Sequence, residues 1–172
     1  MDSQELLSRF GEKIGISLSL EDGACAFEAD GSLITINDLP EIGAIALSGD
    51  LGEPPPERLE ALYRTLLEAN HLFRETAGAT ISLDPDAGRF TLCKSLPAAL
   101  LDQDSFFGEV ERFVNAVESW SRLIRDFRSA AAEAAANDGE DAASAPALGS
   151  GGFLSVYTVF PFPGETGRDR DE

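Results

Sequence analysis

The stretch ERLEALYRTLLEANHLFRETAGATISL, residues 57–83, decides how the rest of the chain is arranged. Three prolines precede it at 54–56, and proline is tolerated in a first helical turn because its missing N–H has no helical partner there. Apolar residues then recur at three- and four-residue spacing, which indicates one apolar face of a helix. They are Leu59, Leu62, Tyr63, Leu66 and Leu67. The helix is predicted to end between residues 70 and 76. A strand follows, because apolar Ile81 and Leu83 alternate there with polar residues.

Two interpretations of this helix stay open on its pattern alone. Its apolar face either packs in the core of one chain or forms the seam of a dimer, and periodicity does not choose between them.

The remaining elements follow from short patterns on either side of the helix. Alternation and turn signals predict strands at 24–29, 33–37 and 42–47 before it and at 79–83 and 89–96 after it, with Asp30-Gly31 as a two-residue hairpin turn. A short helix with a narrow apolar stripe is predicted at residues 3–14, with Asp2 or Ser3 as its cap. The order α-β-β-β-α-β-β-α predicts an α+β sandwich with one largely antiparallel sheet.

The last helix has the clearest pattern in the sequence. Its large apolar residues are spaced 4, 3, 4, 3, 4, 3, which favours a lid over the sheet, with a coiled coil as the second interpretation. They are Phe106, Val110, Phe113, Val117, Trp120, Ile124 and Phe127, and Phe107, Val114 and Leu123 widen the stripe.

Composition narrows the functional classes. The 172-residue chain has a formal charge of −18, so nucleic acids and anionic membranes are disfavoured as partners. The first ten residues lack the apolar core of a signal peptide, and no run approaches the roughly 18 apolar residues of a membrane span. Cys25 and Cys93 are expected to be free buried thiols. We therefore expect a cytosolic protein.

The residues for catalysis or metal binding are sparse. His71 is the only histidine and has no serine or cysteine motif beside it, and a zinc site lacks ligands. Residues 84–88, DPDAG, begin like a calcium loop, but loop position twelve holds Ser95 instead of an acid. No phosphate-binding loop is present in the sequence. We expect no enzyme activity, no cofactor and no metal.

The composition changes after residue 128. Residues 129–152 are rich in alanine, glycine and acids and are predicted to form a flexible linker, although the first alanines are compatible with a longer last helix. Residues 153–172 comprise an apolar segment, FLSVYTVFPFP, and a charged end. Two interpretations of this segment stay open: a strand added to its own body or to that of a dimer mate, or a disordered tail. The predicted organisation is a domain at 1–128, a linker at 129–152 and a tail at 153–172.

Several stretches together resemble the class I type III secretion chaperones, the Tir-chaperone-like family. The resemblance covers residues 6–127 and rests on order and spacing, because no single motif is diagnostic. The stretches are LLSRFGEKIGI at 6–16, LLEAN at 66–70, TAGATISLD at 76–84, DAGRFTL at 86–92 and the late helix with Trp120. The tail beyond the last helix departs from the family pattern.

The resemblance implies a small homodimer in the cytosol of a Gram-negative bacterium, without catalysis. It implies that the central helix and the strand after it pair across the dimer, and that the partner is the extended N-terminal segment of a secreted effector. The dimer interface would then include Leu59, Leu62, Tyr63, Leu66, Ile81 and Leu83. The predicted effector-binding residues, expected to leave exposed apolar patches, are Leu6, Phe10, Phe27, Ile34, Ile36, Ile45 and Leu47.

Two alternative functions stay open for the same sequence. One is a small regulatory protein that sequesters a protein partner, which would use the same surfaces. The other is a metabolite-binding α+β domain or small enzyme, which needs a polar cluster in a cavity that the scattered acids and His71 do not supply.

Overall fold

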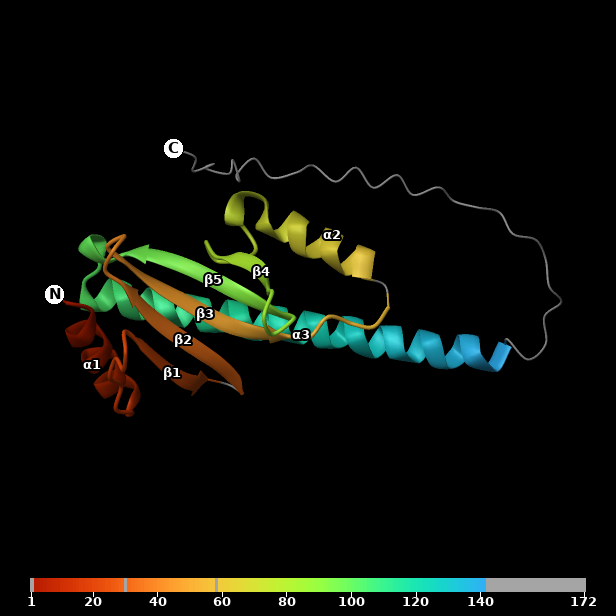
Figure 1. The fold of residues 1–172 in the computed structure, drawn as a ribbon, viewed down its shortest axis with the longest axis horizontal. Coiled ribbons are helices and arrows are strands. Elements are labelled where there is room, and N and C mark those ends of the chain that lie inside the picture. Colours follow the sequence, from red (N-terminus) through yellow and green to blue (C-terminus); the bar gives the residue numbers. More distant parts are fainter. Residues whose placement is uncertain (1, 30, 58, 142–172) are drawn as a thin grey trace, which may run out of the picture.

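A computed structural model of the protein describes residues 2–29, 31–57 and 59–141. Five antiparallel strands form one sheet in the order β1-β2-β3-β5-β4, and the predicted α-β-β-β-α-β-β-α order is confirmed (Figure 1). The elements are α1 (Ser3–Ile14), β1 (Ala24–Ala29), β2 (Ser32–Leu39), β3 (Ala44–Gly52), α2 (Leu59–Asn70), η1 (His71–Phe73), β4 (Thr80–Asp84), β5 (Arg89–Pro97), η2 (Ala98–Leu100) and α3 (Gln103–Asp141).

Helix α1 begins and ends at the residues that its sequence predicts. The Asp2 carboxylate accepts a hydrogen bond of 2.7 Å from the Glu5 backbone N–H, which satisfies one of the free donors of the first turn. Gly15 ends the helix with φ at +79°, a conformation that glycine adopts without strain. The helix buries Leu6, Leu7 and Phe10 against the rest of the core.

Helix α3 covers one face of the sheet, which confirms the predicted lid. Every large residue of its seam from Phe106 to Ile124 is buried. The contact with β3 is close, because a Cβ atom on Gly49 would lie 2.4 Å from the Val117 side chain. Glycine at this position therefore lets α3 lie directly on the strand.

Helix α3 continues to Asp141, so residues 129–141 of the predicted linker are helical. Alanine at most positions from 130 to 136 favours this continuation. The predicted linker beyond it and the tail at 153–172 lie outside the described residues.

The opposite face of the sheet carries short side chains. Ser48 pairs with Cys93 and Thr35 in neighbouring strands, and Ala46 pairs with Ser95. Both cysteines are free and half-buried, where full burial was expected. Within the described residues, no helix has both the length and the apolar composition needed to cross a membrane.

Helix α2 lies beside β4 and packs into the same core as α3. It buries Leu62, Leu66 and Ala69, and the ring of Tyr63 contacts that of Phe90 edge-on at 5.8 Å. The helix ends at Asn70, at the start of the range that the sequence predicts. The chain then turns back through η1 into β4.

Candidate functional site

An apolar groove lies between the end of α1, the strand β1 and the first half of α3. The hollow has a volume of about 430 Å³. We call it the α1–β1 groove, and its lining residues are Phe10, Ile14, Ile16, Phe27, Glu28, Ala29, Phe107, Val110, Glu111, Val114 and Asn115. Apolar side chains form most of this lining, and two glutamates add negative charge.

Aromatic rings form the floor of the groove. The Phe10 ring lies 5.7 Å from that of Phe27 and 5.8 Å from those of Phe106 and Phe107, in tilted or edge-on arrangements that aromatic pairs prefer. The Lys13 ammonium lies 3.6 Å from the centre of the Phe107 ring. These contacts pack the floor of the groove, which is open in the isolated protomer.

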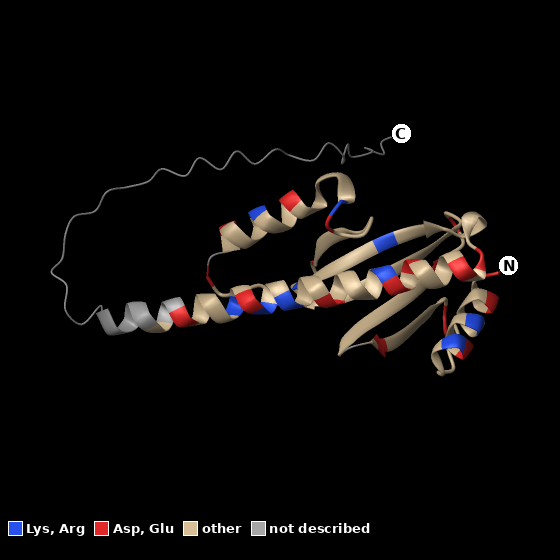
Figure 2. Cartoon of the chain, turned by 180° about the vertical axis from the view of Figure 1, so that it is seen from behind, with Lys and Arg blue, Asp and Glu red and all other residues tan. Residues whose placement is uncertain are grey.

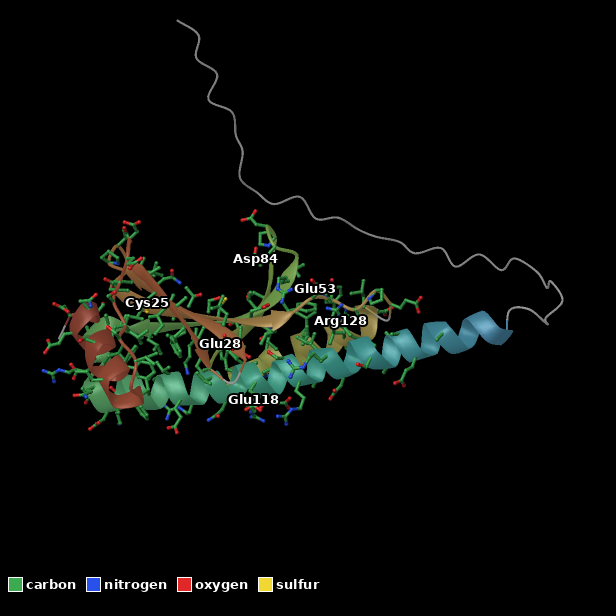
Figure 3. The ribbon with its side chains drawn as sticks, turned by 90° about the horizontal axis from the view of Figure 1, so that it is seen from below. Cys25, Glu28, Glu53, Asp84, Glu118 and Arg128 are labelled. Carbon is green, nitrogen blue, oxygen red and sulfur yellow. The ribbon has the colours of Figure 1, made fainter. Side chains whose placement is uncertain are left out.

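The edge of β1 runs alongside this groove. In the part of the chain that the structure describes, β1 is the first strand of the sheet and β2 is its only neighbouring strand. On its outer side only the first residue, Ala24, is bonded, to Glu21. Figure 3 shows Cys25 and Glu28 on this outermost strand. A free edge next to an apolar groove is the arrangement that binds an extended peptide, since the backbone pairs with the edge and side chains fill the groove.

The other outer edge of the sheet, on β4, has a side-chain partner. The Asn70 amide accepts a 2.8 Å hydrogen bond from the Ile81 N–H and donates one of 3.1 Å to the Ile81 carbonyl. Asn70 therefore occupies the outward backbone groups of Ile81, near the start of β4.

A second apolar surface lies on α2, η1 and β4. Its side chains are between 38% and 70% exposed in the protomer. We call it the α2 patch, and its residues are Tyr63, Leu67, Leu72, Phe73 and Leu83. A monomeric protein rarely leaves several large apolar side chains exposed together, so the α2 patch indicates a contact with another polypeptide.

The backbone within the α2 patch is strained. Leu72 and Phe73 both have φ at +56°, a region that residues with a Cβ atom seldom adopt. The conformation turns both side chains toward solvent, where they are 60% and 54% exposed. A partner that covers them would offset this cost.

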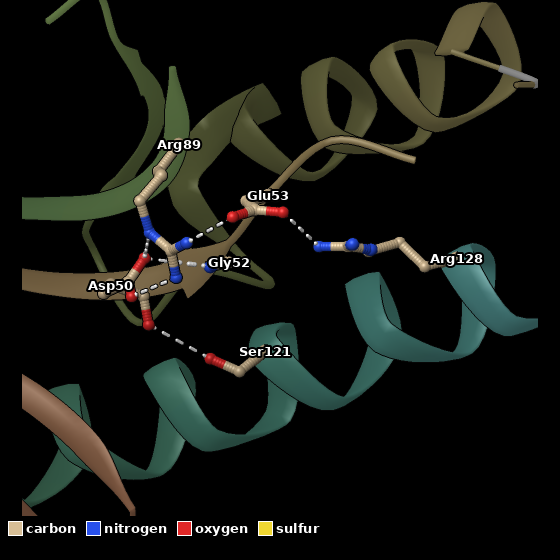
Figure 4. A network of polar contacts seen from close by, with 6 residues as sticks. All are labelled: Asp50, Gly52, Glu53, Arg89, Ser121 and Arg128. Carbon is tan, nitrogen blue, oxygen red and sulfur yellow. Dashed lines mark hydrogen bonds and ion pairs between the residues drawn. The ribbon is translucent and has the colours of Figure 1, made fainter. Parts of the chain in front are cut away.

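A polar network holds the loop that leads into α2 (Figure 4). Arg89 donates hydrogen bonds of 3.0 and 2.6 Å to the two Asp50 carboxylate oxygens and one of 3.2 Å to Glu53. Glu53 also accepts a hydrogen bond of 3.1 Å from Arg128. Partial burial raises the pKa of Asp50, but the bonds from Arg89 and the Gly52 N–H outweigh it and lower the pKa below its ordinary value. The network ties β3, β5 and α3 to the start of the α2 loop.

The surface around both apolar regions is charged. Acidic and basic residues are interspersed along α1 and the outer side of α3 (Figure 2), with pairs such as Arg122 and Glu118 at 2.6 Å. In the described part of the chain, no group of three or more His, Cys, Asp or Glu side chains is placed to hold a metal ion.

The seven residues predicted to bind an effector are all buried in the protomer, so the exposed patches expected there are not observed. Their exposures are 9% or less, because α1 and α3 pack on one face of the sheet: Leu6 and Phe10 lie on the inner side of α1, and the other five lie on the strands beneath. Phe10 and Phe27 line the α1–β1 groove, and their role in binding stays a prediction. The other five lie in the core: Leu6, Ile34, Ile36, Ile45 and Leu47.

The six residues predicted for a dimer interface divide in the same way. Leu62, Leu66 and Ile81 are buried within the protomer and Leu59 is half-buried, whereas Tyr63 and Leu83 belong to the α2 patch. Their participation in a dimer stays a prediction.

Sequence reasoning placed Tyr63, Leu67 and Leu83 of the α2 patch on an apolar face or at the dimer interface, but it missed the other exposed members of both surfaces. In the sequence, four lining residues of the α1–β1 groove have no more than a place at the side of an apolar stripe or just beyond the end of a helix. They are Ile14, Ile16, Phe107 and Val114. Leu72 and Phe73 carried no signal, because their exposure depends on the backbone turn that follows α2.

Comparisons with known proteins agree with this fold. The model of the Tir chaperone protein (CesT) family matches residues 5–121. No curated protein matches the chain.

Solved structures share the architecture at low sequence identity. A chain of the ExsC–ExsE complex superimposes with a TM-score of 0.62 at 24% identity, covering 72% of this chain and 97% of its own. A chain of the HopA1–SchA chaperone–effector complex has a TM-score of 0.56 at 21% identity, covering 71% of this chain and 91% of its own. A chain of the ExoU–SpcU complex from the type III secretion system of Pseudomonas aeruginosa has a TM-score of 0.55 at 23% identity, covering 72% of this chain and 96% of its own.

Proposed function

The chain belongs to the Tir chaperone protein (CesT) family, and from this premise we propose that it is a non-catalytic, cytoplasmic chaperone for a type III secreted effector. The chaperone binds an extended segment near the effector N-terminus and keeps it competent for export. The observation that carries the proposal is the α1–β1 groove beside a free strand edge.

The groove and the edge act on different parts of the segment. Backbone groups of the effector pair with β1, and alternate side chains enter the apolar hollow. Burying those side chains offsets the conformational entropy that the segment loses on binding. The acidic surface favours effector segments with basic residues.

We propose that the α2 patch joins two protomers in a homodimer. In this arrangement the free edges of β1 lie away from the contact, because β1 and β4 are at opposite ends of the sheet. One effector segment of sufficient length then contacts both grooves.

Exposed groove residues test the proposal directly. Ile16 is 42% exposed and Val114 is half-buried, so Ile16→Asp and Val114→Asp place a charge in the groove without removing a core side chain. The ligand is an N-terminal fragment of a secreted effector that co-purifies with this protein, and the measurement is isothermal titration calorimetry. We expect each variant to weaken binding at least tenfold, which corresponds to about 1.4 kcal/mol.

The matched control is Ile42→Asp, at an apolar side chain that is 70% exposed in the turn between β2 and β3. It introduces the same charge away from the groove and should leave affinity unchanged. Equal affinity of all three variants, with native circular dichroism spectra, would contradict the groove as the binding site.

A further inference from the structure

We propose that residues 153–160 of this chain bind as an added strand along the free edge of β1, with Leu154, Val156 and Phe160 in the α1–β1 groove. The chain thereby carries a ligand for its own groove. The docking itself follows from the groove and the edge, and only its consequence for effector binding rests on the proposed function.

The hydrogen bonds at the start of β1 show which backbone groups of its edge point away from β2. The N–H and C=O of Ala24 bond to Glu21 outside the β1–β2 ladder, at 3.0 and 2.8 Å, while the Gly23 carbonyl accepts from Asp38 of β2. Because inward and outward groups alternate along an antiparallel strand, the backbone groups of Ala26 and Glu28 point outward. An added strand would pair with these two residues.

The segment 153–160 has the chemistry that this edge and groove require. It reads FLSVYTVF, carries no charge in a chain of formal charge −18, and is rich in the β-branched and aromatic residues that favour strands. Alternate side chains of a strand share a face, so Leu154, Val156 and Phe160 enter the groove together. Pro161 has no N–H to donate, so pairing ends before it.

The chain is long enough for this docking. Arg125 of α3 and Gly31, two residues after β1, border one hollow, so the end of β1 lies close to Arg125. At a rise of 1.5 Å per residue, the helix from Arg125 to Asp141 extends about 24 Å. The connection from Asp141 to Phe153 spans at most about 40 Å when extended and roughly 20 Å as a flexible coil.

The α2 patch suits this segment less well. A strand docking there would need the outer edge of β4, where the Asn70 amide already binds the N–H and C=O of Ile81. The edge of β1, by contrast, offers backbone partners and an apolar hollow side by side.

Docking has a direct consequence for an effector that uses the same groove. A tethered segment acts at an effective concentration that is in the millimolar range for short flexible connections. The effector must displace it, so weakly matching polypeptides are excluded while a well-matched effector still binds.

The test compares two full-length variants with the wild type by NMR-detected amide hydrogen exchange. Val156→Asp places a charge on the groove side of the added strand, and Ser155→Asp places the same charge on its other side. We expect the Ala26 and Glu28 amides to exchange at least tenfold faster in Val156→Asp than in the wild type. Ser155→Asp should match the wild type, and the Phe27 amide, bonded to β2, is the internal reference.

Two results would overturn the docking. One is fast exchange at Ala26 and Glu28 in all three proteins. The other is protection that Val156→Asp removes from residues 59–73 and not from β1, which would place the segment on the α2 patch.

A separate titration with the effector fragment keeps the two proposals apart. If the segment competes, Val156→Asp should bind the fragment at least fivefold more tightly than Ser155→Asp. Failure of the fragment to bind either variant would refute the proposed function and leave the docking result standing.

Discussion

At the scale of single residues, Lys94 and Glu109 form the least exposed ion pair of the described residues. Their charged atoms are 2.6 Å apart, and the side chains are only 11% and 23% exposed. Lys94 also donates to the carbonyl of Ala77, which has φ at +55° in the turn before β4. The pair thus links β5, α3 and a strained turn.

Replacing Glu109 with glutamine should show what this pair contributes and at which pH. The hydrogen bond from Lys94 lowers the pKa of Glu109 below its ordinary value of 4.5, Arg112 adds to this effect, and partial burial opposes it. The folded carboxylate therefore binds a proton less tightly than the unfolded one. Its stabilisation is fully present above about pH 4.5 and is lost as the pH falls through the lowered pKa.

We expect Glu109→Gln to reduce the free energy of unfolding at pH 7 by about 1.5–3 kcal/mol, because hydrogen bonds to charged groups contribute this much. The difference from the wild type should shrink below pH 4.5 in urea denaturation curves. Glu118→Gln is the control, since its pair with Arg122 is exposed and should matter by under about 1 kcal/mol. A difference that stays constant down to pH 3 would contradict the assignment.

Local pattern predicted which residues are apolar and on which face they lie, but not what covers that face. The seam of α3 was predictable because its spacing repeats over many turns. Ile34 and Leu47 were placed on a binding surface because alternation does not reveal that α3 lies on them. The pairing of Lys94 with Glu109 joins two elements and has no local signal.

At the scale of elements, α2 has two apolar sides. Leu62 and Leu66 face the protomer core, whereas Tyr63 and Leu67 face solvent. The sequence left two interpretations of α2 open, a core helix and a dimer seam. The apolar face of α2 is wide enough to pack in the core on one side and to contact a second protomer on the other. The core role is observed, and the seam role is the proposal that the outward side supports.

Leu67→Asp tests the outward side of α2. Leu67 is 70% exposed in the protomer, so the change should not unfold it, whereas a charge buried without a partner in a dimer contact is costly. We expect light scattering at micromolar concentration to give the mass of one protomer for this variant and of two for the wild type. Ile42→Asp, with an equally exposed side chain, should remain dimeric.

Two results would oppose the dimer proposal at the α2 patch. A wild-type protein with the mass of one protomer would remove the dimer itself. A dimeric Leu67→Asp protein would move the contact to another surface.

Element order was more predictable than element length. The turn residues and the change between strand and helix periods marked all eight main elements. The end of α3 was not fixed by the sequence: the apolar stripe stops at Phe127, the first alanines after residue 128 were compatible with a longer helix, and the helix runs to Asp141. Alanine continues the helix without giving it an apolar stripe.

At the scale of the whole molecule, the two apolar surfaces lie at opposite ends of the sheet (Figure 1). A dimer formed through the α2 patch keeps both grooves accessible, so an effector long enough to contact both gains avidity. Linked binding raises affinity by factors of about 10²–10⁴ when the geometry allows both contacts. A short segment that fills one groove gains nothing from the dimer.

Monomeric Leu67→Asp should therefore separate short from long ligands. For a peptide of about 15 residues that fills one groove, we expect the dissociation constant of the variant to stay within twofold of the wild type. For the effector fragment of about 100 residues, it should rise at least tenfold, because the second groove is no longer on the same particle. Ile16→Asp, which leaves the α2 patch intact, should weaken both ligands. Calorimetry with both ligands gives the dissociation constants for the wild type and for Leu67→Asp. If Leu67→Asp weakens the short and the long ligand equally, the α2 patch shapes the groove itself and does not merely join two grooves.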